Sequence, residues 1–232
     1  MDEYIKDNIH RIRARIDSSA SRAGREPDSV RLLAATKNRI VPEILEAIAA
    51  GITLVGENKV QELLEKEPLV HGEAEVHFIG HLQRNKVRQV VGRVELIHSL
   101  DSIRLAEAID ARAGSMGAGQ EVLVQVNVAA EESKSGVQPE QLEEFIGELG
   151  RLESVKPVGL STIAPLDEDP EGVRWVFKRL RELTSEMDAR FEWFTGRELS
   201  MGMTNDFEVA VEEGSTIVRI GTAIFGPRSR TL

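Results

Sequence analysis

The sequence contains no cysteine, and it has a single tyrosine among its 232 residues. The absence of cysteine excludes disulfide bonds and thiolate chemistry, and it is consistent with a reducing compartment. No hydrophobic run approaches the roughly 20 apolar residues that a membrane span requires. We therefore expect a cytoplasmic protein without a membrane partner.

The sequence also has fewer basic than acidic residues. It contains 29 Lys and Arg and 39 Asp and Glu, which gives a formal net charge of −10. An acidic surface repels phosphate backbones, so we expect no nucleic-acid partner. The short basic segment 83–89, "QRNKVRQ", follows a helical pattern and is interpreted as a solvated face. At the N-terminus, isoleucines recur at helical spacing among charged residues, which predicts an amphipathic helix rather than a signal peptide.

Short apolar runs alternate with longer segments of helical periodicity along the chain. Eight strands alternating with helices, in a chain near the ~250-residue norm, predict an α/β fold with one (β/α)8 barrel of the TIM type. We expect this single domain to cover residues 1–232, with the N-terminal helix as an addition. A doubly wound sheet is the alternative, but "TKNR" after the first strand lacks the glycine fingerprint of that fold. The expected strands are 30–36, 52–56, 75–80, 94–100, 121–128, 155–162, 198–203 and 215–221.

Polar side chains follow the expected strands, where a (β/α)8 barrel places its active site. Lys37 follows the first strand, Asn58 the second and His81 the third. Lys134 belongs to the loop after the fifth strand, and Ser161 is near the end of the sixth. These residues are therefore the first candidates for a site at the barrel mouth.

The last two expected strands run into glycine-containing segments, "SMGMT" with Ser200 and Gly202, and "RIGTAIFG" with Arg219, Gly221 and Thr222. Backbone N–H groups at a helix start bind phosphate, and barrels often place a phosphate site in these two loops. Strand eight neighbours strand one in a closed barrel. We therefore expect the first-strand lysine to stand beside a phosphate site.

A lysine at the mouth of an apolar barrel is expected to be desolvated, which frees its amine as a nucleophile. A lysine beside a phosphate site predicts a Schiff base. The partner is either pyridoxal 5′-phosphate (PLP) or a phosphorylated carbonyl substrate, as in a lysine-type aldolase. The residues by themselves leave both possibilities open.

A series of longer motifs narrows this choice. The segments "ATKNR", "VGENKVQE", "HFIGHLQRNKV", "IHSLDS", "VLVQVNVAAEESKSGV", "GLSTIAP" and "LSMGMTNDFEVAVEEGSTIVRIGTAIFG" occur in this order between residues 30 and 226. Together they resemble the pyridoxal phosphate homeostasis protein family, which is similar to the N-terminal barrel domain of alanine racemase. The resemblance implies a Schiff base of PLP on Lys37, a phosphate site at Ser200, Gly202, Gly221 and Thr222, a pocket lined by Asn58 and His81, and Arg219 against the pyridine nitrogen.

The resemblance also implies a carrier rather than a racemase. An arginine side chain has no acceptor for the proton of a pyridinium, so Arg219 would leave the ring nitrogen unprotonated. The ring is then a weak electron sink, and carbanion chemistry on it is poorly supported. A racemase needs a second base, commonly a tyrosine from another domain, and Tyr4 lies in the N-terminal helical segment. We expect a monomer that holds PLP in vitamin B6 homeostasis without robust turnover, with PLP-dependent apoenzymes as candidate partners. A racemase-like enzyme is the alternative.

Three other polar features receive structural interpretations. His77 and His81 are four residues apart, but they fall on a strand and its exit, and no third ligand is evident, so no metal site is predicted. Glu57 and Asp206 are interpreted as acids at helix starts, although Glu57 could act as an acid or base.

Two positions have a functional alternative that the sequence leaves open. Lys134 is interpreted as a solvated loop residue, with the alternative that its amine helps to transfer the cofactor. The family usually has methionine at the position of Ser161, and we interpret this serine as a small packing substitution.

Overall fold

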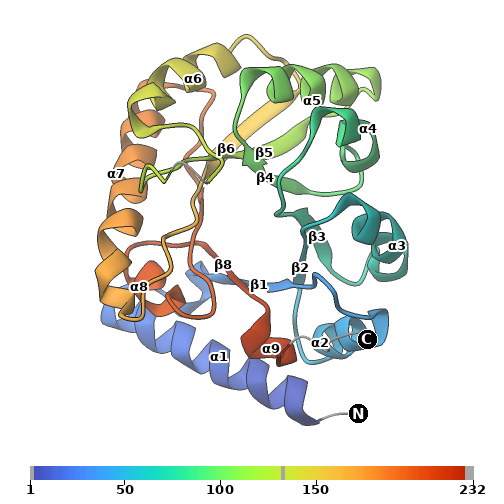
Figure 1. Ribbon diagram of the computed structural model, residues 1–232, viewed down its shortest axis with the longest axis vertical. Coiled ribbons are helices and arrows are strands. Elements are labelled where there is room, and N and C mark those ends of the chain that lie inside the picture. Colours follow the sequence, from blue (N-terminus) through green and yellow to red (C-terminus); the bar gives the residue numbers. More distant parts are fainter. Residues whose placement is uncertain (1–2, 132–133, 228–232) are drawn as a thin grey trace.

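The computed structural model describes residues 3–131 and 134–227. Within these residues, eight parallel strands pair in chain order and close into a barrel with helices around it (Figure 1). The strands are β1 Arg31–Ala35, β2 Leu54–Glu57, β3 Glu75–Phe78, β4 Leu96–Leu100, β5 Gln120–Gln125, β6 Val155–Ser161, β7 Glu198–Ser200 and β8 Ile217–Ile220. The helices are α1 Glu3–Arg22, α2 Val41–Ala49, α3 Val60–Val70, α4 Val87–Val90, α5 Ile103–Ser115, α6 Leu142–Leu149, α7 Arg174–Arg190, α8 Phe207–Glu212 and α9 Thr222–Phe225.

The predicted (β/α)8 barrel is thus confirmed, and each predicted strand overlaps an observed one. The fifth and seventh strands each end three residues before their expected ends, since β5 ends at Gln125 and β7 at Ser200, whereas the apolar patterns continued to residues 128 and 203. At Gly202 the backbone has φ +95°, which turns the chain out of the strand direction. The Asp169 side chain accepts the N–H of Glu171 and starts the turn that leads into α7.

Part of the barrel interior is filled by an apolar cluster that is separate from the core between sheet and helices. On β1, for example, Leu33 belongs to the interior cluster, whereas Leu32 and Ala34 belong to the core between sheet and helices, as the two-residue period of a strand requires. The interior cluster consists of six buried residues, which are Leu33, Leu54, Leu96, Leu123, Val158 and Ile217.

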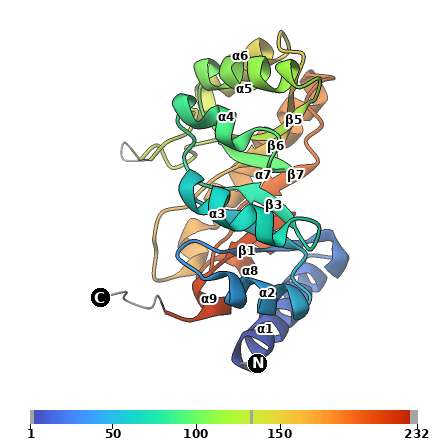
Figure 2. The ribbon, with the colours of Figure 1, turned by 90° about the vertical axis from the view of Figure 1, so that its right-hand side faces the viewer.

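The N-terminal helix α1 covers one side of the barrel, where it packs on α8, α9 and α2 (Figures 1 and 2). Its isoleucines at positions 5, 9, 12 and 16 are buried, as their helical spacing predicted. No helix in the described part of the chain combines the length and apolarity that crossing a bilayer would demand.

Candidate functional site

A cavity of about 550 Å³ opens at the C-terminal ends of the strands. Strand exits from opposite ends of the sequence meet there, because closure of the barrel makes β1 and β8 neighbours. Five of the predicted site residues line this cavity, namely Lys37, Asn58, Arg219, Gly221 and Thr222.

Lys37 leaves the end of β1 on a tight turn. The preceding Thr36 is buried, and its N–H donates to the carbonyl of Gly56 at 3.0 Å. The next residue, Asn38, has a positive φ of 57°, and the N–H of Arg39 closes the turn on Thr36. The side chain of Lys37 is exposed, so the predicted desolvation of this amine is not found.

A buried ionic network holds the exits of β1 and β2 together. The Lys66 amine donates to the Thr36 carbonyl at 2.8 Å, to Glu57 Oε1 at 2.9 Å and to Glu62 Oε2 at 2.7 Å. The Thr36 hydroxyl also donates to Glu57 Oε1, at 2.5 Å. We call Thr36, Glu57, Glu62 and Lys66 the wall network, because they lie between the barrel and α3.

The wall network corrects the interpretation of Glu57. This residue ends β2 rather than starting the next helix, and its side chain is only 2% exposed. Burial raises the pKa of Glu57, while its hydrogen bonds with Thr36 and Lys66 act in the opposite direction. The sequence shows the Glu62–Lys66 spacing of four, but nothing in it indicates that Lys66 is buried.

Arg219 lies at the floor of the cavity with its guanidinium fixed by acceptors. Its Nη1 donates to the Ser200 carbonyl at 2.7 Å and to Ser200 Oγ at 2.5 Å, and its Nη2 donates to the Thr162 carbonyl at 2.8 Å. Burial lowers the pKa of Arg219 to about 10, with Asp206 opposing this effect. The arginine is therefore a cation with a fixed orientation at the cavity.

The resemblance implies that Ser200 and Gly202 belong to the phosphate site, and this assignment stays a prediction. Ser200 is fully buried inside the barrel, and neither residue lines the cavity. Because β7 ends early, the exit of this strand instead brings Met203, Thr204 and Asn205 to the cavity wall.

The start of α9 does lie at the cavity, as predicted. Gly221 is its N-cap, and the first N–H groups of a helix have no acceptor within the helix. A Cβ at Gly221 would lie 3.1 Å from the Ala35 carbonyl, so glycine permits the close approach of β8 to β1. Gly221 and Thr222 consequently border the same space as Lys37.

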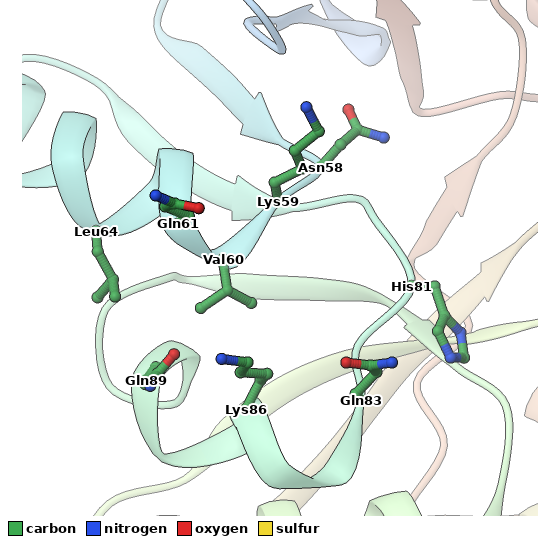
Figure 3. A pocket seen from close by; sticks show the side chains of 9 residues that line it. All are labelled: Asn58, Lys59, Val60, Gln61, Leu64, His81, Gln83, Lys86 and Gln89. Atoms are coloured by element: carbon green, nitrogen blue, oxygen red, sulfur yellow. The ribbon is translucent and has the colours of Figure 1, made fainter.

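Asn58 is shared between the main cavity and two smaller neighbours. Its Oδ1 atom is buried without a hydrogen-bond partner among the described residues. One neighbouring cavity, of about 500 Å³, lies between α3 and the turn that leads into α4; there, Lys86 and Gln89 face Gln61 across the gap (Figure 3).

His81 lines this neighbouring cavity and a further one of about 210 Å³, but it is absent from the lining of the main cavity. Its side chain is exposed, and its Nδ1 lies 3.4 Å from Asp101 Oδ2. His81 thus borders the space beside the main cavity, and its place in a cofactor pocket stays a prediction.

Lys134 lines the cavity of about 210 Å³, beside Asn58 and Ile163. Its amine donates to Glu131 Oε1 at 2.7 Å and to the Ala164 carbonyl at 3.1 Å. The interpretation as a freely solvated loop lysine is thus incomplete, because the amine is tethered at the barrel mouth. Residues 132 and 133 of the same predicted loop lie outside the described residues.

Comparison with known proteins agrees with this geometry. Residues 5–229 match the family described as alanine racemase, N-terminal domain. The pyridoxal phosphate homeostasis protein of Aquifex aeolicus is 47% identical over 224 residues, which cover 96% of this chain and 97% of that protein. The chain belongs to the pyridoxal phosphate homeostasis protein family.

Two solved structures resemble this family member over almost its whole length. An unknown protein from Bifidobacterium adolescentis has a TM-score of 0.89 and 41% identity, covering 96% of this chain and 95% of that one. PipY of Synechococcus elongatus PCC7942, with PLP bound, has a TM-score of 0.80 and 35% identity, covering 91% of this chain and 100% of that one.

Asp206 lines the cavity and is the N-cap residue of α8. It directly precedes α8, as predicted, and its Oδ1 accepts the N–H of Met203 at 2.6 Å. Burial raises the pKa of Asp206. Among residues 3–131 and 134–227, no three His, Cys, Asp or Glu side chains are grouped so that they could hold a metal ion.

A second buried network lies inside the barrel. His77 Nδ1 is 2.9 Å from His98 Nε2, and His98 Nδ1 is 2.9 Å from Ser200 Oγ, which Arg219 contacts. We call His77, His98, Ser200 and Arg219 the lumen network. His77 is a buried strand residue, as predicted, but nothing in the sequence pairs it with His98.

Ser161 also contacts the lumen network. Its hydroxyl donates to the backbone carbonyl of His98 at 2.5 Å, and the residue is buried. This serine therefore makes a specific hydrogen bond in addition to filling a small space.

Proposed function

We propose that this chain binds PLP on Lys37 and serves PLP homeostasis without robust turnover. One observation carries the proposal: a lysine amine, a buried arginine and the start of a helix border the same cavity of about 550 Å³. The PLP-bound relative from Synechococcus elongatus supports it.

The residues at the cavity fit PLP in their chemistry. When bound, PLP supplies an aldehyde that forms a Schiff base with a lysine amine. Lys37 would provide this amine, and the N–H groups at Gly221 and Thr222 would hold the phosphate. Arg219 has only donors to offer, so it would accept no proton and would leave the ring nitrogen unprotonated. Asn58 has an Oδ1 atom free to accept a hydrogen bond.

The proposed lack of turnover rests on the same cavity. An unprotonated ring nitrogen makes the ring a weak electron sink. The single tyrosine, Tyr4, lies on α1, where its hydroxyl would be 3.4 Å from a Cβ built at Gly226, and it is not part of the cavity lining. A tyrosine base of the kind that racemases use is therefore missing from the described wall of the cavity.

An absorbance spectrum tests the proposed binding. We expect purified protein mixed with PLP to show a band at about 420 nm, typical of a protonated Schiff base of PLP with lysine. The band should vanish in Lys37→Ala and persist in Lys59→Ala, which removes an exposed lysine of the adjoining cavity. A band that survives without Lys37 contradicts the proposal. Covalent trapping of a phosphorylated carbonyl compound by PLP-free protein would favour the aldolase instead.

Hydrogen exchange on amino acids tests the proposed lack of turnover. The PLP-loaded protein is incubated with L-alanine in deuterium oxide, and deuterium at the α-carbon is followed by NMR, with an alanine racemase as the positive control. We expect no incorporation above that of free PLP. Lys37-dependent incorporation at an enzymatic rate would favour the racemase-like alternative.

We further propose that Lys134 assists cofactor release, since its amine is held at the rim of the mouth. Lys134→Ala should slow transfer of PLP to an acceptor apoenzyme while leaving the amount of bound PLP unchanged. Lys156→Ala is a matched control, because that lysine also donates to a backbone carbonyl but lies at the start of β6. Equal transfer rates in the wild type and Lys134→Ala would remove this role.

A further inference from the structure

The lumen network crosses the interior of the barrel between strands that are not neighbours. His98 lies on β4 and Ser200 on β7, and three strand positions separate these two in the barrel order. The 2.9 Å contact between His98 Nδ1 and Ser200 Oγ must therefore span the lumen. At the N-terminal end of the barrel, His77 Nε2 is 3.7 Å from Glu75 Oε2. The contacts thus extend from the cavity floor to the opposite end of the barrel.

One direction along the chain gives every donor of the lumen network an acceptor. Arg219 can only donate, so Ser200 Oγ accepts from it, and among the described residues His98 Nδ1 is the acceptor within reach of the Ser200 proton. His98 must then carry its proton on Nε2, where it donates to His77 Nδ1. His77 in turn carries its proton on Nε2, which faces the carboxylate of Glu75.

The surroundings keep both imidazoles uncharged. Burial lowers the pKa of His77 and lowers that of His98 well below its usual value. A positive charge on His98 would also be repelled by Arg219, which is buried in the same lumen. The charged groups that face the two histidines from the packed strands are Arg31, Glu75, Glu95 and Arg219.

We propose that His98 and His77 are positioning residues that, through Ser200, fix the guanidinium of Arg219 in its orientation toward the cavity. This inference rests on the proposed function, because it gives Arg219 its place beside the cofactor ring. Arg219 keeps its proton, so the chain transmits orientation rather than a proton. If apolar side chains replaced the two histidines, the Ser200 hydroxyl would lose the partner that orients it. The hydrogen bond from Arg219 Nη1 to Ser200 Oγ would then be less well fixed.

The tautomers give a test that needs no cofactor. Protein with nitrogen-15 in its histidines should show His77 and His98 as neutral rings protonated on Nε2 near neutral pH. A ring protonated on Nδ1, or a charged ring, would overturn the proposed direction of the chain. This measurement stands whether or not PLP binds, so it separates the inference from the proposed function.

Substitution of His98 tests the effect on the cofactor. His98→Leu should weaken PLP binding about tenfold, as expected for loss of support to one hydrogen bond of a charged group. It should also make the bound-cofactor absorbance vary with pH where that of the wild type is constant. His98→Gln, whose amide can both accept and donate, should restore most of the affinity. Wild-type affinity and pH profile in His98→Leu would overturn the proposal.

A substitution at the surface tests the proposal even if His98→Leu does not fold. Glu75→Gln removes the carboxylate at the far end of the chain, and it should shift the nitrogen-15 signals of His77 and, to a smaller extent, of His98. Glu121→Gln is the matched control, because this partly exposed acid also lies near the N-terminal end of its strand, β5, and is paired with Arg197 instead. Unchanged signals in Glu75→Gln, or equal shifts in both variants, would contradict a chain that ends at Glu75.

Discussion

The wall network and the lumen network are both buried beside the same cavity, yet they differ in charge and in what they hold. The wall network combines two carboxylates with the amine of Lys66, and it fixes the backbone where Lys37 and Asn58 leave their strands. The lumen network contains one cation, Arg219, and otherwise neutral groups, and it fixes a side chain that borders the cavity. We therefore expect damage to the wall network to reduce stability, and damage to the lumen network to alter ligand binding and pH behaviour.

The largest expected effect is that of Lys66→Ala. This change leaves Glu57 buried without its cation, and removal of one partner of a buried ion pair typically costs about 3–5 kcal/mol in the free energy of unfolding. Urea denaturation measures the loss. Lys59→Ala is the control, because Lys59 is exposed and also contacts Glu62, so its loss should stay within about 0.5 kcal/mol. Equal losses in both variants would show that the burial of the wall network does not determine its contribution to the free energy of unfolding.

Acid should destabilise the protein through the lumen network. The folded pKa values of His77 and His98 lie below the usual 6.5, so the unfolded chain binds protons that the folded chain does not. This contribution to stability is fully present above pH 6.5 and is lost progressively as the pH falls from 6.5 toward the folded pKa values. Each histidine adds a slope of up to about 1.4 kcal/mol per pH unit.

Unfolding free energies measured from pH 7 down to about pH 5 check this slope. In His98→Gln the slope of unfolding free energy against pH should decrease by the amount that one histidine contributes. In Lys66→Ala the part of the slope that comes from His77 and His98 should remain. A wild-type profile that is flat below pH 6.5 would mean that the lumen histidines titrate normally.

Gly202→Ala should have a smaller effect. Gly202 receives the N–H of Arg219 on its carbonyl, has φ +95°, and a Cβ there would lie 2.7 Å from the Cβ of Ala210. Gly24→Ala is the matched control, since Gly24 has φ +68° with open space around it. We expect Gly202→Ala to lose about 1–3 kcal/mol more than the control, which is the cost of overpacking alone. Thermal unfolding measures the loss of stability in both variants. Equal losses would show that backbone strain, rather than overpacking, dominates at both sites.

Thr36→Val should have the smallest effect of the four. It removes the hydroxyl that donates to Glu57, while Lys66 still donates to the same carboxylate oxygen. The loss should be about 1 kcal/mol, the usual net value of a hydrogen bond. Thr184→Val, which removes a hydroxyl bonded within α7, should cost less. A loss above that of Lys66→Ala would place the centre of the wall network at Thr36.

Much of the site could be predicted because strand order and strand ends follow local patterns. The alternation of apolar runs with helical segments predicted the barrel, and the first residue after β1 and the start of α9 followed directly from it. Lys37, Gly221 and Thr222 then had to meet once β8 paired with β1. The sequence did not indicate that Ser200 is buried against His98, because this contact joins strands that are far apart along the chain.

The sequence by itself therefore determined the barrel, the position of Lys37 at its mouth and the family to which the chain belongs, since each depends on residues close together along the chain or in a fixed order. Only the tertiary structure decided that His98 meets Ser200 across the lumen and that Lys66 is buried against Glu57. Such contacts join residues on different elements. They arise from the closure and stagger of the strands, which no local pattern specifies.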